Sequence, residues 1–156
     1  MKIKLAIAGL ALILAGCQSA TDSSKESSYG QDVKAVKTAS TMDQAQLTST
    51  FYFAYDKASL DDTSKKLLQA HAEFLNSHPE QSITIAGHTD ARGTKEYNQS
   101  LGQRRANAIA SFLKEQGVAQ NQIKTVSFGK EHPLTNAEND QAQALNRRAE
   151  INYTDN

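Results

Sequence analysis

Two residues of this sequence, Asp90 and Arg105, have the types and the spacing for ligand chemistry. Arg105 falls on the inward stripe of an expected helix, where a guanidinium that cannot lose its proton needs a partner. Asp90 lies on the loop that leads into that helix and is the obvious carboxylate for it. The same loop exposes backbone N–H groups at a helix N-terminus, a favourable place for anions. An acid beside an anion site would suit a zwitterionic ligand.

Simpler interpretations of these residues remain open. Asp90 and Arg105 could form a purely structural ion pair, or Arg105 could reach solvent at the edge of its stripe. The two arginine pairs, Arg104-Arg105 and Arg147-Arg148, would each place one member inward and one in solvent. A ligand role is open for the inward member of each pair.

Metal and enzyme chemistry find less support. His88 and Asp90 stand two positions apart and could form half of a metal site, but His71, His78 and His132 fall in other expected elements. No serine stands in a Gly-x-Ser-x-Gly turn, and the single cysteine has another use. We therefore expect no metal, no cofactor and no catalytic activity.

The elements that position these residues follow from hydrophobic periodicity. Alternation predicts strands, and apolar positions three and four apart predict helices. Tyr52, Phe53 and Tyr55 are expected in the core, and Asp56 is either a turn residue or a second acid at the mouth of the same cleft. The expected strands are 50–55, 82–87, 122–128 and 149–153, and the expected helices are 61–76, 95–116 and 140–147. This βαβαβ(α)β order predicts an α/β sandwich, with one mixed four-stranded sheet and helices on one face.

The first sixteen residues have the pattern of an export signal. Lys2 and Lys4 precede an apolar run over 5–15, and small residues lead to Cys17, the only cysteine of the 156 residues. The eleven apolar residues rise about 16 Å as a helix, well short of a hydrocarbon core of about 30 Å. The stretch 14–17 resembles the lipobox of bacterial lipoproteins, which implies cleavage before the cysteine and acylation of its thiol. Ordinary secretory cleavage that leaves a free thiol is the alternative.

Composition restricts the function of the chain after the leader. Cleavage before Cys17 leaves 140 residues with 15 basic and 17 acidic side chains, a net charge of −2 that excludes a strongly basic nucleic-acid binder. Gln18 comes directly after the cysteine, which in the lipoprotein resemblance implies the outer membrane, with the chain on its periplasmic face. Residues 18–49 are polar with sparse apolar positions, so a flexible tether is expected. The expected parts are a signal peptide over 1–16, a lipidated tether over 17–49 and one domain over 50–156.

The loop around Asp90 and the helix after it resemble the OmpA-like peptidoglycan-binding domain family. The likeness runs through Gly87-His88-Thr89-Asp90-Ala91-Arg92-Gly93-Thr94, Glu96-Tyr97-Asn98, Leu101-Gly102 and Arg104-Arg105-Ala106. It continues in 126–131 and 146–151 and covers about residues 50–153. The resemblance implies the fold of that family and noncovalent binding of peptidoglycan.

The resemblance also implies ligand residues. Asp90 and Arg105 would grip the meso-diaminopimelate of the peptide stem, whose ammonium and carboxylate groups match a zwitterion-binding pair. Further residues implied to line the same cleft are Asp56, Arg92, Thr94, Asn98, Leu101 and Arg147.

Partners and cellular role follow from the resemblance as well. Lipid-anchored members of the family imply Tol-system partners, a TolB-like β-propeller protein and a TolA-like protein. They also imply a role in envelope integrity and in drawing the outer membrane inward at cell division. A wall-binding lipoprotein without Tol partners remains an alternative, as does a periplasmic metal-dependent enzyme or sensor that uses His88 and Asp90.

Overall fold

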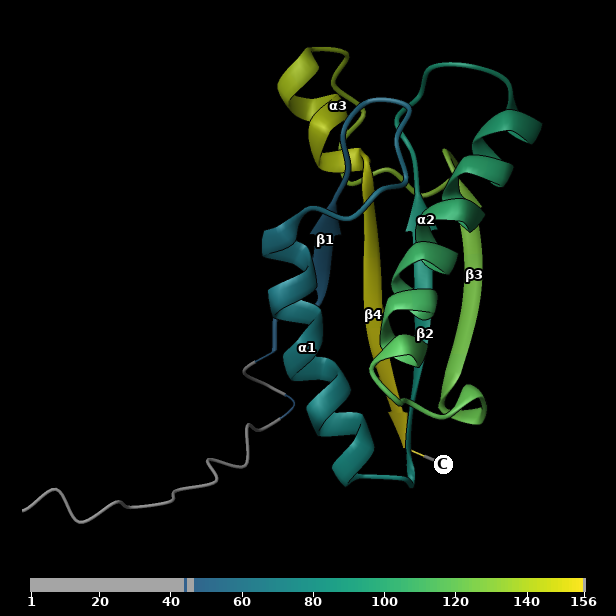
Figure 1. Cartoon of the computed structure of the whole chain (residues 1–156). Coiled ribbons are helices and arrows are strands. Elements are labelled where there is room, and N and C mark those ends of the chain that lie inside the picture. The colour runs from purple at the N-terminus through teal and green to yellow at the C-terminus, as the bar shows by residue number, and fades with distance from the viewer. Residues whose placement is uncertain (1–43, 45–46, 156) are drawn as a thin grey trace, which may run out of the picture. The chain divides into compact units, whose positions relative to one another are not determined.

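The computed structural model describes residue 44 and residues 47–155. The predicted signal peptide, Cys17 and most of the predicted tether lie outside the described residues. The elements in chain order are β1 (Thr50–Tyr52), α1 (Asp62–Ser77), β2 (Gln81–His88), α2 (Lys95–Glu115), the 3-10 helix η2 (Gln120–Gln122), β3 (Ile123–Gly129), α3 (Asp140–Asn146) and β4 (Arg148–Asp155) (Figure 1). Within this part of the chain, no helix has the length and apolarity needed to cross a membrane.

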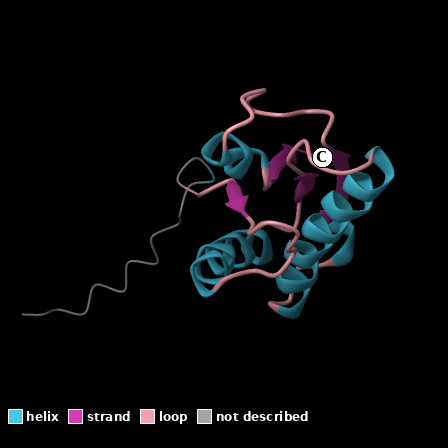
Figure 2. Cartoon of the chain, turned by 90° about the horizontal axis from the view of Figure 1, so that it is seen from above, coloured by secondary structure: helices cyan, strands magenta, loops and turns pink. Residues whose placement is uncertain are grey.

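The four strands form one mixed sheet in the order β1-β4-β2-β3. β4 runs antiparallel to both of its neighbours, whereas β2 and β3 are parallel and are joined through α2. α1 and α2 cover the same face of the sheet (Figure 2), and α3 lies at the end where β2 finishes (Figure 1). The predicted α/β sandwich is confirmed.

The core fills the space between the sheet and the two long helices, and the predicted inward stripes form it. Leu68 and Leu75 of α1 and Ile109 and Leu113 of α2 are fully buried, and each pair lies on one face of its helix. Ile83, Ile85, Phe51, Ala149 and Ile151 meet them from the strands. The helices are therefore held by burial of one apolar face each, which is the main source of helical stability in a small domain.

β1 is shorter than the strand predicted over 50–55, and only part of its aromatic set is buried. Pairing with β4 ends at Tyr52, opposite Arg148, and the chain then turns at Asp56. Phe53 is buried, but Tyr52 and Tyr55 are 53% and 57% exposed. The expectation that both tyrosines are core residues is wrong. Tyr52 alternates onto the face that α1 and α2 leave uncovered, and Tyr55 lies beyond the end of the strand.

Both ends of α2 are fixed by local hydrogen bonds. The Thr94 hydroxyl accepts the backbone N–H of Tyr97 at 3.2 Å, which caps the N-terminus. At the C-terminus Gly117 adopts a φ of 93°, and the N–H of Val118 bonds to the carbonyl of Leu113 at 3.1 Å. This is a Schellman motif, and it ends α2 at Glu115, one residue before the predicted end at 116.

Two glycines let α2 pack directly on β2. A Cβ on Gly87 would lie 1.9 Å from the carbonyl oxygen of Gly102, and a Cβ on Gly102 would lie 2.3 Å from Ser127 Oγ. The Ser127 hydroxyl donates to the carbonyl of Gln99 at 2.8 Å and ties the same helix to β3. Backbone contact of this kind fixes the depth at which the first turns of α2 sit over the sheet.

His71 clamps the chain as it enters β1. Its Nε2 lies 2.7 Å from the carbonyl oxygen of Thr48 and therefore carries the proton, and its Nδ1 accepts from the Tyr153 hydroxyl at 2.7 Å. Burial lowers the pKa of His71 and raises the pKa of Tyr153, so both groups stay neutral. Ser49, which follows Thr48, accepts at its carbonyl oxygen a hydrogen bond from the backbone N–H of Ile151 at 2.8 Å.

Candidate ligand-binding site

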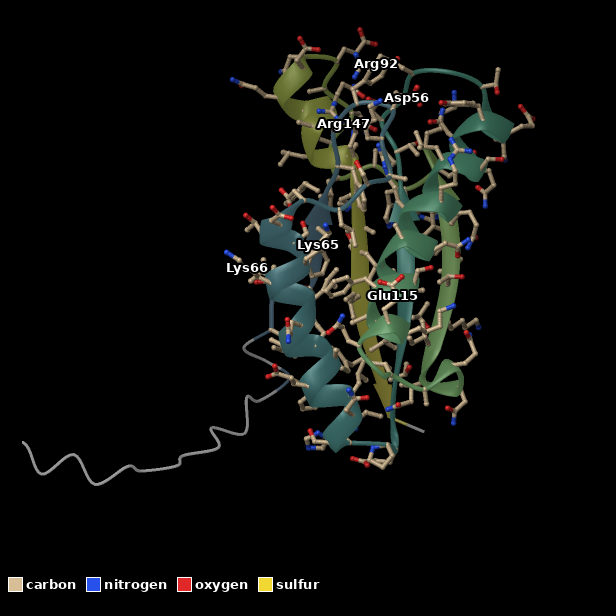
Figure 3. The ribbon with its side chains drawn as sticks, viewed as in Figure 1. Asp56, Lys65, Lys66, Arg92, Glu115 and Arg147 are labelled. Atoms are coloured by element: carbon tan, nitrogen blue, oxygen red, sulfur yellow. The ribbon has the colours of Figure 1, made fainter. Side chains whose placement is uncertain are left out.

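A cavity of about 160 Å³ at one end of the sheet brings together most of the predicted site residues. Its lining comes from the loop after β1, the loop between β2 and α2, the first turns of α2 and the residue after α3. Figure 3 shows Asp56, Arg92 and Arg147 gathered at this end, away from Lys65 and Lys66 on α1. The lining residues are Tyr55, Asp56, Asp90, Arg92, Gly93, Tyr97, Asn98, Leu101, Arg105 and Arg147.

Arg105 is held at the cavity by backbone carbonyls. The side chain is fully buried, and it donates from Nε to Lys57 at 2.9 Å, from Nη1 to His88 at 2.7 Å and from Nη2 to Ala54 at 3.3 Å. Burial lowers the pKa of Arg105 to about 10, and the charge of Asp90 opposes that shift. Its direct partners are therefore three carbonyl oxygens. The prediction that Asp90 pairs with it directly is wrong.

Arg105 still has donors for a ligand. A guanidinium carries five N–H groups, and the three carbonyls take one each from Nε, Nη1 and Nη2. One N–H remains on each terminal nitrogen, and a guanidinium N–H is a strong donor to a carboxylate oxygen. A side chain that already has three fixed bonds can bind an anion without first being ordered.

Asp90 is the buried acid of the cavity, and other arginines pair with it. Its side chain is 6% exposed, and Oδ2 accepts from Arg92 Nη2 at 2.7 Å and from Arg92 Nε at 3.2 Å. Arg147 Nη1 lies 3.5 Å from the same oxygen. Oδ1 accepts the backbone N–H of Arg92 at 3.3 Å. The hydrogen bond to Asp90 raises the pKa of Arg92.

Arg92 and Arg147 differ in how firmly they are held. The side chain of Arg147 is 15% exposed, and its Nε also donates to the carbonyl of Phe53 at 3.1 Å. Arg92 is 45% exposed, and its guanidinium carbon lies 4.1 Å from the ring centre of Tyr55. Arg147 is thus part of the fixed wall, whereas Arg92 covers Asp90 from the solvent side.

Asp56 provides a second acid at the cavity. Its φ of 56° lies in the left-handed region, which aspartate tolerates better than most residues. The Tyr97 hydroxyl donates to Asp56 Oδ1, and this bond raises the pKa of Tyr97. Asp56 therefore both turns the chain and faces the cavity, so its two predicted roles are compatible.

Asn98 and Thr94 shape the loop between β2 and α2. The buried Asn98 side chain donates from Nδ2 to the carbonyls of Arg92 at 2.8 Å and of Thr94 at 2.9 Å. Leu101, one turn further along α2, gives the cavity an apolar surface. Thr94 is not among the lining residues, because it caps α2. The prediction that it lines the cleft is wrong.

Some lining residues were not expected from the sequence. Tyr97 precedes Leu101 by four positions and Arg105 by eight, so helix periodicity alone would have placed it on the same face. Tyr55 was expected in the core from strand alternation, and its only other signal was its place before Asp56. The unexpected lining residues are Tyr55, Gly93 and Tyr97.

His88 and Asp90 do not share a site. The His88 ring stacks on Phe128, with 5.4 Å between the ring centres, whereas the Asp90 carboxylate bonds to Arg92. Burial, followed by the nearby charge of Arg148, lowers the pKa of His88 to about 4. Across residues 47–155, no group of three or more histidine, cysteine, aspartate or glutamate residues gathers for a metal ion.

The arrangement can receive two opposite charges at once. Arg105 and Arg147 are both fixed by carbonyls and suit a carboxylate, and Asp90 suits an ammonium group. With Asp56 and Arg92 included, the cavity holds two acids and three arginines. A zwitterion would find both of its charges matched over a short distance.

Comparison with known proteins assigns this fold to a family. Residues 52–147 match the OmpA family, and this range holds all ten lining residues. The chain belongs to the OmpA family. The predicted family is therefore confirmed, and membership of it also confirms that the chain is not an enzyme.

Individual proteins and solved structures that resemble this chain include two peptidoglycan-associated lipoproteins. The peptidoglycan-associated lipoprotein of Pasteurella multocida is 40% identical over 149 residues, which are 96% of this chain and 95% of that protein. The crystal structure of the peptidoglycan-associated lipoprotein from Burkholderia pseudomallei matches with a TM-score of 0.69 at 43% identity, over 70% of this chain and 92% of that one. The C-terminal domain of Helicobacter pylori MotB matches with a TM-score of 0.64 over 70% of this chain and 86% of that chain, and at 21% identity this likeness shows the fold alone.

Proposed function

We propose that this domain binds peptidoglycan noncovalently by holding the diaminopimelate of the peptide stem in the cavity. The observation that carries the proposal is that one small cavity holds both an arginine that can bind a carboxylate and an aspartate that can bind an ammonium group. Arg105 has two N–H groups available for a carboxylate, and Asp90 is a buried acid that can accept from an ammonium group. The names of the lipoproteins that resemble this chain support the same class of ligand.

The chemistry of meso-diaminopimelate fits these receptors. The free end of its side chain carries an ammonium and a carboxylate on one carbon, and methylene groups lead to it, for which Leu101 offers an apolar surface. A lysine in the same stem position has the ammonium group but lacks the carboxylate. Lysine would leave Arg105 and Arg147 without an anion, which is costly where the arginines are buried. The cavity should therefore prefer diaminopimelate.

Wall selectivity tests this proposal. We expect residues 18–156 to co-sediment with purified sacculi whose stems carry meso-diaminopimelate, and to bind lysine-type sacculi at least about 10-fold more weakly. The reason is that a hydrogen bond to a charged group contributes about 1.5–3 kcal/mol. The measurement is the bound fraction against protein concentration, with the muropeptide profile checked to show that the wall is unchanged. Equal binding to both kinds of wall would contradict the proposal.

The proposal includes an anchor, which lies outside the described residues. Cys17 would carry the acyl chains that hold the protein in the outer membrane, because two or three chains make dissociation negligible whereas one holds only marginally. The predicted tether would then act as a spacer up to residue 47, because His71 holds Thr48 to the domain. Residues 18–47 span about 30 Å as a coil and at most about 110 Å when extended. Membrane and wall would thus be joined by one chain that faces the periplasm.

Changing Cys17 to serine should release the protein from the membrane. We expect Cys17→Ser to appear as soluble or uncleaved protein, because no thiol remains to receive a diacylglyceryl group. The measurement is fractionation of cells in high salt, with a change of the neighbouring Ser19 to alanine as the matched control. A Cys17→Ser protein that still fractionates with the outer membrane would overturn the anchor.

Tol-system partners form the last part of the proposal. Its support is the likeness to lipoproteins of the peptidoglycan-associated kind, from which a role in envelope integrity and cell division would follow. The alternative is a wall-binding lipoprotein of the same family without these partners. A pull-down with purified TolB-like β-propeller protein separates the two, since retention supports the first and absence of retention supports the second.

A further inference from the structure

We propose that Arg92 is a built-in competitor for the ligand, which occupies Asp90 in the free protein and is displaced by the ligand's ammonium group. This inference rests on the proposed function of the cavity. It gives Arg92 a role opposite to that of a simple ligand contact. Removing its charge should strengthen binding.

The first argument is occupancy. The strongest contacts of Asp90 Oδ2 are the two bonds from the Arg92 guanidinium, at 2.7 and 3.2 Å. The Asp90 side chain is 6% exposed, and of its two arginine partners Arg92 is the one that reaches solvent, at 45% exposed against 15% for Arg147. An ammonium group that bonds to the same oxygen would come within a few ångströms of the guanidinium charge, and like charges at that distance repel. The ligand ammonium group and the Arg92 guanidinium therefore compete for this carboxylate.

The second argument is that Arg92 can leave at low cost, whereas Arg147 cannot. Arg147 is mostly buried and has its own bond to the Phe53 carbonyl. The Arg92 side chain is 45% exposed, and its support is a tyrosine ring that is itself 57% exposed. Its backbone N–H also bonds to Asp90 Oδ1, so rotation of the side chain alone would open the site and leave the loop in place.

The third argument is charge balance. With Arg92 in place, the two acids and three arginines of the cavity carry a net charge of +1. Once the Arg92 side chain has turned outward, the remaining four groups are neutral, and so is a zwitterionic ligand. In most molecules of the free protein, Arg92 is therefore paired with Asp90 and the site is closed. The apparent affinity for the ligand equals the affinity of the open site multiplied by the fraction of molecules that are open.

Neutralising Arg92 tests the inference. The probe is a stem tripeptide that ends in meso-diaminopimelate, titrated into residues 18–156 by calorimetry. We expect Arg92→Gln to bind about 3- to 10-fold more tightly than wild type, as removal of a competing state that leaves about 10–30% of molecules open would give. Arg92→Lys, which keeps the charge but loses the fork, should fall between the two. Lys95→Gln removes a nearby exposed charge outside the cavity and should stay within about 2-fold of wild type.

The side chain itself gives an independent readout. In ¹⁵N NMR spectra of the wild type, the Arg92 Nε–H resonance should shift to that of a solvated arginine when the tripeptide is added, even if Arg92→Gln proves poorly folded. Weaker or unchanged binding by a folded Arg92→Gln, or an Arg92 resonance that stays fixed on saturation, would overturn the inference. Failure of the wild type to bind the tripeptide at all would instead overturn the proposed function.

Discussion

Replacing Arg105 by alanine should weaken binding of diaminopimelate-type stem peptides by about 10- to 100-fold or more. The change removes the two N–H groups that would hold the ligand carboxylate, and each of them would make a charge-assisted hydrogen bond to it. It also leaves the carbonyls of Ala54, Lys57 and His88 without their donor, at about 1–3 kcal/mol for each one that water cannot reach. Affinity should therefore be measured by calorimetry with the melting temperature beside it.

The adjacent arginine supplies the matched control. Arg104 is exposed and does not line the cavity, so Arg104→Ala should bind normally. Amidating the ligand carboxylate should weaken binding to wild type far more than binding to Arg105→Ala, since only the wild type has lost a contact. If Arg105→Ala melts normally and binds sacculi with unchanged affinity, this residue is not part of the wall site, and Asp56 with Arg147 becomes the next pair to test.

Replacing Gly87 by alanine should destabilise the whole domain. The new methyl group would lie 1.9 Å from the carbonyl oxygen of Gly102, a backbone atom that cannot rotate away. Overpacking of a core usually costs about 1–3 kcal/mol, and a clash with backbone belongs at or above the upper end. For a domain of about 100 residues, this corresponds to a fall of about 12 °C or more in melting temperature.

Gly117 offers a control that separates crowding from backbone strain. A Cβ there meets nothing closer than 3.7 Å, but its φ of 93° is unfavourable for alanine. Gly117→Ala should therefore cost only about 1–2 kcal/mol. Urea unfolding of both variants measures the difference. Near-equal losses would show that close contact between α2 and β2 is not what Gly87 provides.

Most of the fold could be predicted because apolar periodicity reports which face of an element is buried. The stripe through Leu101, Arg105 and Ile109 identified the inward face of α2 although one member is charged. Periodicity does not report where a strand stops pairing. The alternation through Tyr55 continues past the last pair of β1, and only the left-handed turn at Asp56 shows why the chain leaves the sheet.

The sequence predicted most of the residues that line the site, but it did not predict which of them bond to one another. Asp90 and Arg105 do line one cavity, as their loop and helix positions indicated. Sequence patterns do not reveal backbone carbonyls as partners, because every residue has one and only the folded chain decides where it points. The carbonyl of His88 is such a case, and its bond to Arg105 leaves Asp90 available to Arg92.

Thr48, which His71 holds, comes just before β1, and the cavity residues Tyr55 and Asp56 come just after it. This separation determines how the domain would respond to mechanical force. In the proposed tether, tension would enter at Thr48 and leave through the bound wall, along the axis of the strand. The bonds between β1 and β4, together with the bond from Ile151 to Ser49, would then be loaded in shear and would share the force. A short strand loaded in this direction resists far better than one peeled open bond by bond, so optical-tweezers pulling along β1 should require more force than pulling across the sheet.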